Sequence, residues 1–591
     1  MAAWSFIVHR YLTRELPCWK EPPKGHPPVR RLRVFTQDPS LGQLDGAIST
    51  LEIDNERLEP GPAGSYFVVV DSDRDHLKEY PAVDLDRPEL LMRDGLDPST
   101  TDRAFTCQMV YAVAMETYAR FAQALGRNPG FGPIPHEDGR LRIVPRAFKD
   151  ANAYYDREEG AVLLGWDHAR KFAQGRSQPG GHVFLGLSHD VVAHEVSHAL
   201  LDGLRPNFLR PTHPDVGALH EAFGDLVAVF LHFAQPKSLT LALERTQGSI
   251  EDDQLAAIGR QFGFDLLDGR NPLRTALRTT DLNERILDKD LLYDPRKEEH
   301  DLGSVLLSAV FEAYRRVYKR KTATLRRVFA SYQGRLPAEG IELLAGEASR
   351  LAEQFLSILL RAIDYCPSHH CTFGEYLRAM ITADFELVPQ DPWAYRESLV
   401  TSFRRFGITV PDVMDLSERS LLWRPVDPAV EIEALRFERL SLEADHGQID
   451  WGQNRESLRV AAEALGRAIC NSEQGPQFGL VEPSATVLPA AIMSMRTLRR
   501  VAPDRSVKID LVAEVVQKKK VREGYFFGGS TLVIDSKGRI RYAISKDLNS
   551  TRRLREQRAW LRDQPAEIRE AAWAERSQVS AHLQRRIHLE R

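Results

Sequence analysis

The spacing of hydrophobic residues changes along the chain and predicts strands first and helices later. Residues 1–85 carry short alternating runs such as RRLRVF and SYFVVVDSD between prolines, which indicate a small β-rich N-terminal domain. Helical spacing from about 100 to 126 ends at Gly126. The segments RLRIVPRAF and GAVLLGW then have the apolar, β-branched composition of strands. We therefore expect a strand-rich lobe after the first domain.

Helical spacing dominates after residue 190 and predicts a second, mostly helical lobe. Apolar residues recur every three or four positions in HEVSHALLDGL, ALHEAFGDLVAVFLHF, LGSVLLSAVFEAYRRVY, EASRLAEQFLSILLRAIDY and TFGEYLRAMITAD. We place the first two of these helices with the strand-rich lobe in 86–235 and the others in a helical lobe over 236–412.

The last part of the chain, 413–591, contains both helical and strand-like spacing of apolar residues. ESLRVAAEALGRAI has helical spacing, VKIDLVAEVV, STLVI and IRYAI resemble strands, and DSKG is typical of a hairpin turn. We expect a separate α+β accessory domain here, and an α+β fold for the whole chain.

Composition narrows the classes of partner. The 591 residues suffice for several domains with cores of their own. The chain has 79 Lys+Arg against 83 Asp+Glu, so its nearly balanced charge creates no overall electrostatic attraction to nucleic acid or an anionic membrane. No apolar run reaches the roughly 18 residues of a membrane span. The five cysteines are scattered, unlike those of a disulfide framework, and the first residues lack the pattern of a signal peptide. We therefore expect a cytoplasmic protein without nucleic-acid or membrane partners.

The stretch HDVVAHEVSHALLDGL carries the strongest chemical signal. His194 and His198 are four residues apart, so a helix places both on one face, where they can bind one zinc ion. Glu195 is rotated by about 100° around the helix and can instead act as a general base on a metal-bound water. The alternative is an amphipathic helix with hydrogen-bonded histidines.

The next helix supplies the ligand that a catalytic zinc site would still need. Such a site has three protein ligands and one open position. Glu221 can be the third ligand, and Asp225, one turn later, can accept the second ring proton of a ligating histidine. The alternative is a solvated carboxylate pair.

Together, DVVAHEVSHAL and EAFGD resemble the zinc signature of thermolysin-like gluzincin peptidases, in which an ExxxD helix completes an HExxH helix. NAYYDREEGAVLLGW is similar to that family's edge strand, which implies that Asn152 and Ala153 hold the substrate backbone in an extended form. EEHDLGSVLLSAVFEAY resembles a family helix that begins with a histidine, so His300 would stabilise the oxyanion. An ordinary edge strand and a surface cap are the alternatives.

The same resemblance implies a two-lobe core and further residues. Asp294 would orient His300, with Glu298 or Glu299 as alternatives, and Arg274, or else Arg278, would bind the substrate carbonyl. The likeness covers about 135–405 and is greatest to a non-secreted bacterial group without a named substrate.

Three features concern other sites. Asp190 keeps one calcium-ligand position of the family, but His232 replaces a glutamate, which argues against calcium. The family's oxyanion tyrosine has no counterpart in RPNFLRPTHPDVG. CPSHHC lacks the spacing of a standard metal site, and we favour a plain loop.

The sequence thus predicts an endopeptidase with one Zn²⁺ per chain that acts on a peptide or protein. The alternative is a catalytically weak or inactive zinc-containing scaffold that recruits a protein partner through 413–591.

Overall fold

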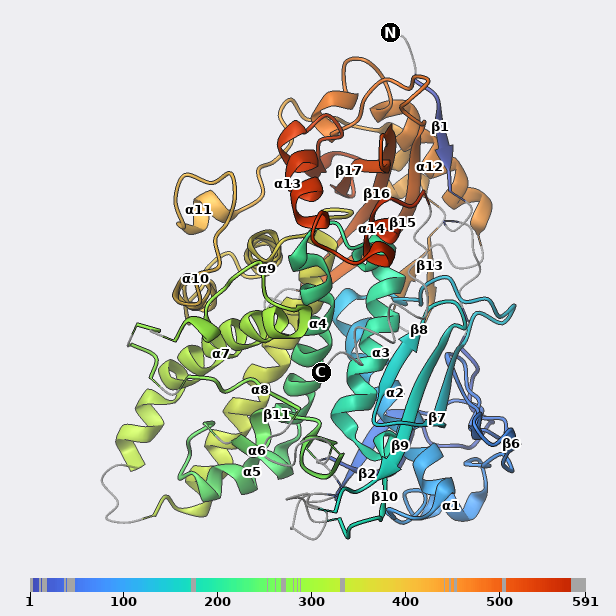
Figure 1. Ribbon diagram of the computed structural model, residues 1–591, viewed down its shortest axis with the longest axis vertical. Coiled ribbons are helices and arrows are strands. Elements are labelled where there is room, and N and C mark those ends of the chain that lie inside the picture. Colours follow the sequence, from blue (N-terminus) through green and yellow to red (C-terminus); the bar gives the residue numbers. More distant parts are fainter. Residues whose placement is uncertain are drawn as a thin grey trace.

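The computed structural model shows a mixed α and β architecture (Figure 1). It describes residues 4–575 except 10–11, 13–16, 18, 37–38, 40–47, 172–176, 252, 261, 267–272, 280, 284, 287, 330–334, 441, 446–447, 451–453 and 502–505. One sheet has the order β10-β9-β7-β4, and β8 pairs with β9 beside β10. Its strands are β4 (Phe67–Val69), β7 (Leu141–Lys149), β8 (Ala153–Asp156), β9 (Ala161–His168) and β10 (His182–Phe184). Two of these are the strands predicted from RLRIVPRAF and GAVLLGW.

Helix α2 (Arg103–Leu125) links this sheet to the helical half of the molecule. It contacts β4 and β7 as well as helices α3 and α8, and most of its residues are buried. The Asp102 side chain caps its first turn, and Gly126 ends it with φ 69°, a conformation that glycine adopts without a steric penalty. The predicted glycine stop is therefore confirmed.

The helices that follow the sheet form most of the second half of the core. Helices α3 (His189–Leu204) and α4 (Pro214–Phe233) pack against each other in the middle of the molecule (Figure 1). The longer helices beyond them are α7 (Glu299–Phe329), α8 (Ala338–Ala362), α9 (Phe373–Leu387) and α10 (Tyr395–Arg405). All four predicted long helical segments after HEVSHALLDGL are confirmed.

Shorter elements connect these parts. They are β2 (Val29–Phe35), β3 (Ile48–Asp54), β5 (Ser72–Asp73), β6 (Lys78–Glu79), α1 (Pro88–Met92), α5 (Pro236–Arg245), α6 (Asp253–Ala256), β11 (Ala257–Ile258), β12 (Arg274–Thr275), α11 (Glu418–Leu421), β13 (Glu443–Asp445) and β14 (Gln448–Asp450).

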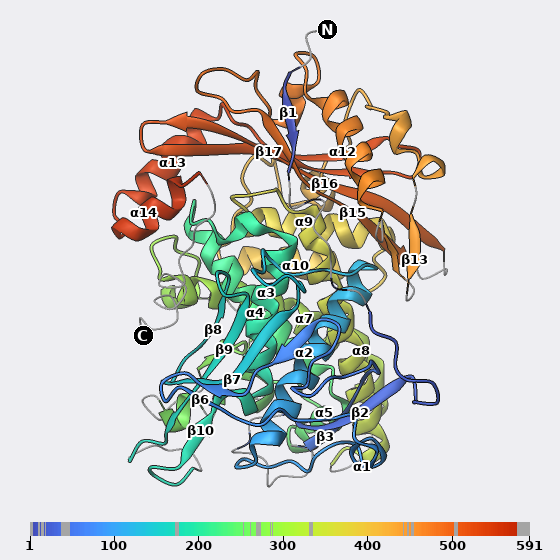
Figure 2. The same cartoon turned by 90° about the vertical axis from the view of Figure 1, so that its right-hand side faces the viewer.

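A second five-stranded sheet contains the C-terminal strands in the order β1-β15-β16-β17-β18. Its members are β1 (Phe6–Val8), β15 (Ala490–Val501), β16 (Val507–Val521), β17 (Gly524–Ile534) and β18 (Ile540–Lys546). Figure 2 shows it across the top of the molecule, with α12 (Arg455–Ile469) on its outer side and α13 (Thr551–Leu561) and α14 (Ala566–Trp573) at one end.

Both faces of this C-terminal sheet are buried, because successive residues of a strand point to opposite faces. Val512 and Val533 belong to the main core, whereas Leu511 and Ala513 pack in a second core with α12. The segment LVAEVV, apolar except for Glu514 and buried throughout, fits such a strand, covered on both sides.

The strand pairing bears on two of the predicted separations. Residues 1–85 contain the two-stranded sheets β2-β3 and β5-β6, but Phe6 pairs with Ala490 in the C-terminal sheet and Phe67 pairs with Leu141 in the first sheet. The expected α+β content of 413–591 is present, but its sheet shares the main core instead of standing apart. Backbone pairing between distant segments and burial of the second sheet face are the physical reasons.

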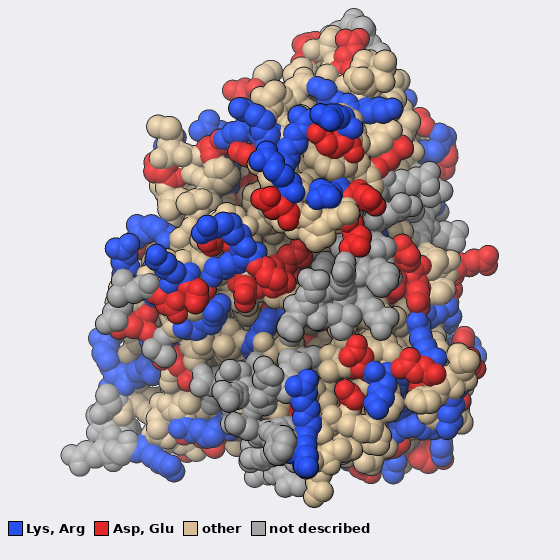
Figure 3. All heavy atoms as spheres, viewed as in Figure 1, with Lys and Arg blue, Asp and Glu red and all other residues tan. Residues whose placement is uncertain are grey.

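Helix α4 is, within the described residues, long and apolar enough by composition to cross a membrane, yet 94% of its apolar window is buried inside the protein. Such burial is typical of a core helix. On the face seen in Figure 3, acidic and basic residues are interspersed, which agrees with the balanced charge of the sequence.

Candidate metal centre

Helix α3 places two imidazoles toward α4. His194 and His198 lie one turn apart, and each is only 3% exposed. Their rings meet nearly edge to face, with centroids 4.4 Å apart. All residues of α3 are buried, so the polar side chains of HEVSH need partners inside the protein.

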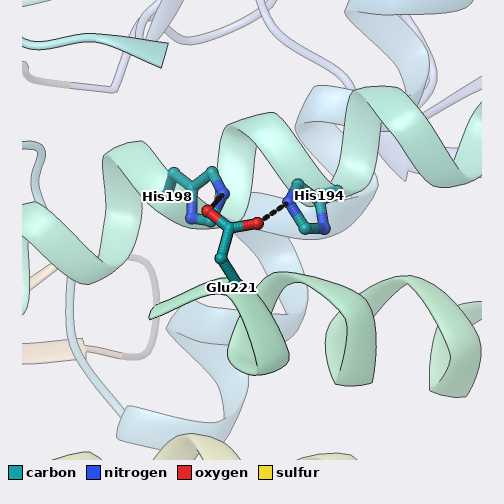
Figure 4. Close-up of side chains that lie close together, drawn as sticks. All are labelled: His194, His198 and Glu221. Carbon is teal, nitrogen blue, oxygen red and sulfur yellow. Dashed lines mark ion pairs between the residues drawn. The ribbon is translucent and has the colours of Figure 1, made fainter. Parts of the chain in front are cut away.

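Glu221 reaches from α4 to the space between the two rings (Figure 4). Its Oε2 lies 3.5 Å from His194 Nε2, and its Oε1 lies 3.5 Å from His198 Nε2. These separations are long for hydrogen bonds. Tetrahedral zinc ligands at about 2.0–2.2 Å from the ion lie about 3.3–3.5 Å from one another, so the spacing fits a shared metal better.

The close approach of α3 and α4 depends on Gly224. A Cβ atom at this position would lie 2.7 Å from His194 Nδ1, inside van der Waals contact. A glycine inside a helix costs stability, and here the imidazole occupies the space of the missing side chain. The glycine of EAFGD is a signal of this packing that the sequence analysis did not use.

Asp225 lies on the Nδ1 side of the His194 ring. Its Oδ1 lies 3.0 Å from His194 Nδ1, and its Oδ2 lies 2.7 Å from Arg274 Nε. An acceptor at Nδ1 leaves Nε2 of the same ring available for a metal. The structure thus brings Arg274 into the site, where its Nη1 is also 3.9 Å from Glu221 Oε2.

Glu195 is buried beside this cluster, outside the set of converging donors. The backbone N–H of Tyr155 on β8 donates a hydrogen bond to its carboxylate, while Oε2 is buried without a hydrogen-bond partner among the described residues. Burial raises the pKa of Glu195 to about 7; His194 and Arg274 oppose this shift and Glu221 adds to it. The sequence analysis did not anticipate the Tyr155 contact.

His300 stands at the start of α7 and faces Glu221, with its Nε2 3.3 Å from Glu221 Oε2. Its Nδ1 lies 2.8 Å from Glu298 Oε1, and the same carboxylate accepts the His300 backbone N–H. Burial alone would lower the pKa of His300, but Glu221 and Glu298 outweigh it and raise the pKa to about 9. The prediction that Asp294 orients His300 is wrong, because Asp294 pairs with Arg296 at 2.7 Å. Glu298 was the alternative.

The edge strand lies where the sequence pattern predicts it. Ala153 begins β8, pairs with Leu164 of β9, and the strand packs against α3. Asn152 directly precedes β8; it is 3% exposed, and its Nδ2 has no hydrogen-bond partner among the described residues. A buried amide donor without a partner is costly unless a ligand or water satisfies it.

A histidine and a glutamate beside the cluster have surroundings that the sequence did not reveal. His220 stacks on His198 with ring centroids 4.6 Å apart, and burial lowers its pKa to about 4. It is outside the group of converging donors. Glu299 packs against Gly217, and burial together with Glu221 raises its pKa to about 7.

The donor set fits zinc in both type and charge. In the described part of the chain, the metal-compatible group is His194, His198 and Glu221, whose donor atoms lie within 4.8 Å of one another. Burial lowers the pKa of His194, but the neighbouring carboxylates of Asp225 and Glu221 stabilise the protonated ring and raise the pKa to about 9. The buried carboxylates therefore attract a cation, which can be a proton or a metal, and zinc binding would release that proton.

The other predicted sites differ from this one. Both Asp190 oxygens accept hydrogen bonds, one from Ser188 Oγ at 2.5 Å and one from the Gly259 N–H at 2.5 Å. In CPSHHC, His369 Nε2 lies 3.0 Å from the Phe527 carbonyl oxygen and His370 Nδ1 lies 3.1 Å from Thr212 Oγ1. His369 thus joins the loop before α9 to β17, and His370 joins the same loop to the α3–α4 connection.

No protein-family model matches this chain, and no curated protein matches it either. The assignment of function therefore depends on the geometry of the site.

Proposed function

We propose that the chain is a zinc-dependent endopeptidase of the thermolysin-like gluzincin type, similar to the non-secreted bacterial group. The observation that carries this proposal is the convergence of His194, His198 and Glu221 at ligand distances, next to the buried carboxylate of Glu195. The sheet with β8 and the helices after α4 would be the two lobes, with the metal centre between them.

Bound zinc would polarise the scissile carbonyl and acidify a water molecule. Glu195 would accept the proton of the attacking water through its unpartnered Oε2 and pass it to the leaving amine. A pKa of about 7 suits both halves of this task near neutral pH.

His300 and the edge strand would act on the substrate. His300 Nε2 would donate a hydrogen bond to the oxyanion, and the pKa of about 9 keeps this donor charged at neutral pH. Asn152, whose Nδ2 lacks a described partner, and the backbone at Ala153 would bind an extended peptide beside β8. Arg274 would bind the substrate carbonyl while it holds Asp225.

The test uses the purified full chain, unfolded casein and a peptide library, with and without a zinc chelator. The parent should contain about one zinc and cleave in a chelator-sensitive way. Glu195→Gln should keep the zinc and lose cleavage by about 10²–10⁴-fold, the contribution of a general base. The exposed Glu244→Gln is the matched control and should cleave normally.

Equal cleavage by Glu195→Gln and the parent would overturn the mechanism. Full zinc content without any chelator-sensitive cleavage would instead favour the zinc-containing scaffold.

A further inference from the structure

A cavity of about 630 Å³ lies among α2, α7, α8, α9 and the end of β15. None of the residues of the metal centre lines it. Its size is that of pockets that enclose small organic ligands, about 300–1,000 Å³. It lies where the helical core meets the C-terminal sheet, with Val501 of β15 in its wall.

Most charged side chains in and around the cavity are already paired. The ion pairs are Arg120–Glu353 at 3.0 Å, Lys321–Glu347 at 2.9 Å, Arg350–Glu347 at 2.8 Å and Asp384–Arg396 at 2.6 Å. Asp391 accepts the backbone N–H groups of Tyr395 and Arg396 at the start of α10. These groups therefore have partners within the protein.

Arg361, which also lines the cavity, differs from these groups because no ion pair compensates its charge. Its Nε is buried without a hydrogen-bond partner, and no hydrogen bond or ion pair joins its guanidinium to another described residue. Burial lowers its pKa, and Asp384, the nearest acid that opposes this, is already bound to Arg396. Arg361 is partly exposed and lines the cavity, so its guanidinium is available to an anionic group inside the cavity.

The walls restrict the chemistry of a ligand. Leu356, Ile358 and Trp393 line the cavity together with Tyr395, so an apolar or aromatic body fits it. A guanidinium binds carboxylate and phosphate groups through paired N–H donors. Here one cation is uncompensated, and Asp384 and Asp391 would repel a second negative charge, which favours a monoanion.

We propose that this cavity binds a small organic acid with one carboxylate on an apolar body, and that Arg361 pairs with the carboxylate. This site is independent of peptide hydrolysis and of zinc. Its position between α8, α9 and β15 lets the ligand join the helical core to the C-terminal sheet.

Isothermal titration of the full chain with hydrocinnamate, its neutral amide, octanoate and inorganic phosphate tests this proposal. At least one of the two carboxylates should bind at or below about millimolar Kd, and hydrocinnamate should bind about tenfold or more tightly than its amide. Phosphate should bind more weakly than the carboxylates. No binding of either carboxylate, or equal binding of acid and amide, would overturn the proposal.

Variants separate a binding role from a structural one. Arg361→Met should reduce carboxylate affinity about tenfold or more and, without ligand, should not lower the melting temperature, because no ion pair is lost. Arg361→Lys keeps the charge without the paired donors and should retain intermediate affinity. Arg327→Gln, at an exposed position of α7 outside the cavity, is the control and should bind like the parent. A lower melting temperature for Arg361→Met with unchanged affinity would show that Arg361 is structural.

Discussion

Buried charges gather in two regions of this protein, at the metal centre and at the interface between the helical core and the C-terminal sheet. At the interface, Arg127 forms two hydrogen bonds of 2.7 Å with Asp364, and Arg500 bridges Glu386 and Asp510. At the metal centre, His194, His198 and Glu221 face one another at 3.5 Å. Both regions are buried, but the opposite charges of the interface are in direct hydrogen-bond contact, whereas the three converging donors of the candidate metal centre are not.

The residue types explain this difference. Arginine keeps its charge and presents a planar set of donors, so an arginine–carboxylate pair is complete by itself. Histidine near a carboxylate holds a proton that a metal can replace. A buried cluster built from histidines and spaced for a shared ion therefore indicates a binding site, whereas an arginine-closed cluster indicates an interface within the fold.

Glu221→Gln should have the largest effect of the variants that test this comparison. It removes the charged ligand, so zinc content should fall from about one per chain to near zero, and affinity should fall by more than the about 10–100-fold typical of an outer partner. Zinc content after dialysis and casein cleavage measure this. Glu116→Gln, a carboxylate on His189 outside the site, is the control and should retain zinc. Full zinc content in Glu221→Gln would contradict the ligand set.

Asp364→Asn should have the next largest effect, on stability rather than metal. Arg127 would be left buried without an anionic partner, with only the Thr497 carbonyl oxygen and one amide oxygen as neutral acceptors, and the free energy of unfolding should fall by about 3–5 kcal/mol. The double variant Arg127→Met/Asp364→Leu should recover most of that loss, because an apolar pair can replace a closed ion pair. Denaturant unfolding at fixed zinc measures both.

An exposed pair serves as the matched control for this experiment. Arg552 and Asp412 are 2.6 Å apart but about two-thirds exposed, 60% and 65%, so Asp412→Asn should cost less than about 1 kcal/mol. Similar losses at Asp364 and Asp412 would mean that the interface pair does not stabilise the fold as a buried pair does.

Asp225→Asn should have an intermediate effect at the metal centre. The asparagine can no longer supply a full negative charge to His194 Nδ1 at 3.0 Å, so zinc affinity should fall by about 10–100-fold. Competition with a chromophoric chelator measures the affinity, with Asp412→Asn as the control. If the affinity is unchanged, the ring of His194 is positioned by packing on Gly224 alone.

The sequence predicts best the contacts that depend on local geometry. His194 and His198 converge because residues four apart share a helix face, and the run of consecutive buried residues in β16 follows from burial of both faces of the sheet. The pairing of Phe6 with Ala490 has no local signal, because strands at opposite ends of the chain meet only in the folded protein.

The choice of the acid beside His300 shows the same limit at the site. Asp294, Glu298 and Glu299 all lie within a few residues of His300, and composition cannot rank them. The structure at the start of α7 ranks them. Glu298 accepts the His300 backbone N–H and also contacts the His300 ring, while Asp294 pairs with Arg296. Glu299 points instead toward Gly217 of α4.

Glu298→Gln should therefore have the smallest effect, confined to catalysis. Loss of one hydrogen bond to the His300 ring is worth about 0.5–1.5 kcal/mol, which corresponds to a decrease in kcat of roughly two- to tenfold with zinc content unchanged. Asp294→Asn is the matched control and should cleave casein like the parent, since Asp294 contacts Arg296. If Asp294→Asn lowers kcat and Glu298→Gln does not, the orienting carboxylate is Asp294, and the arrangement at the start of α7 changes when substrate binds.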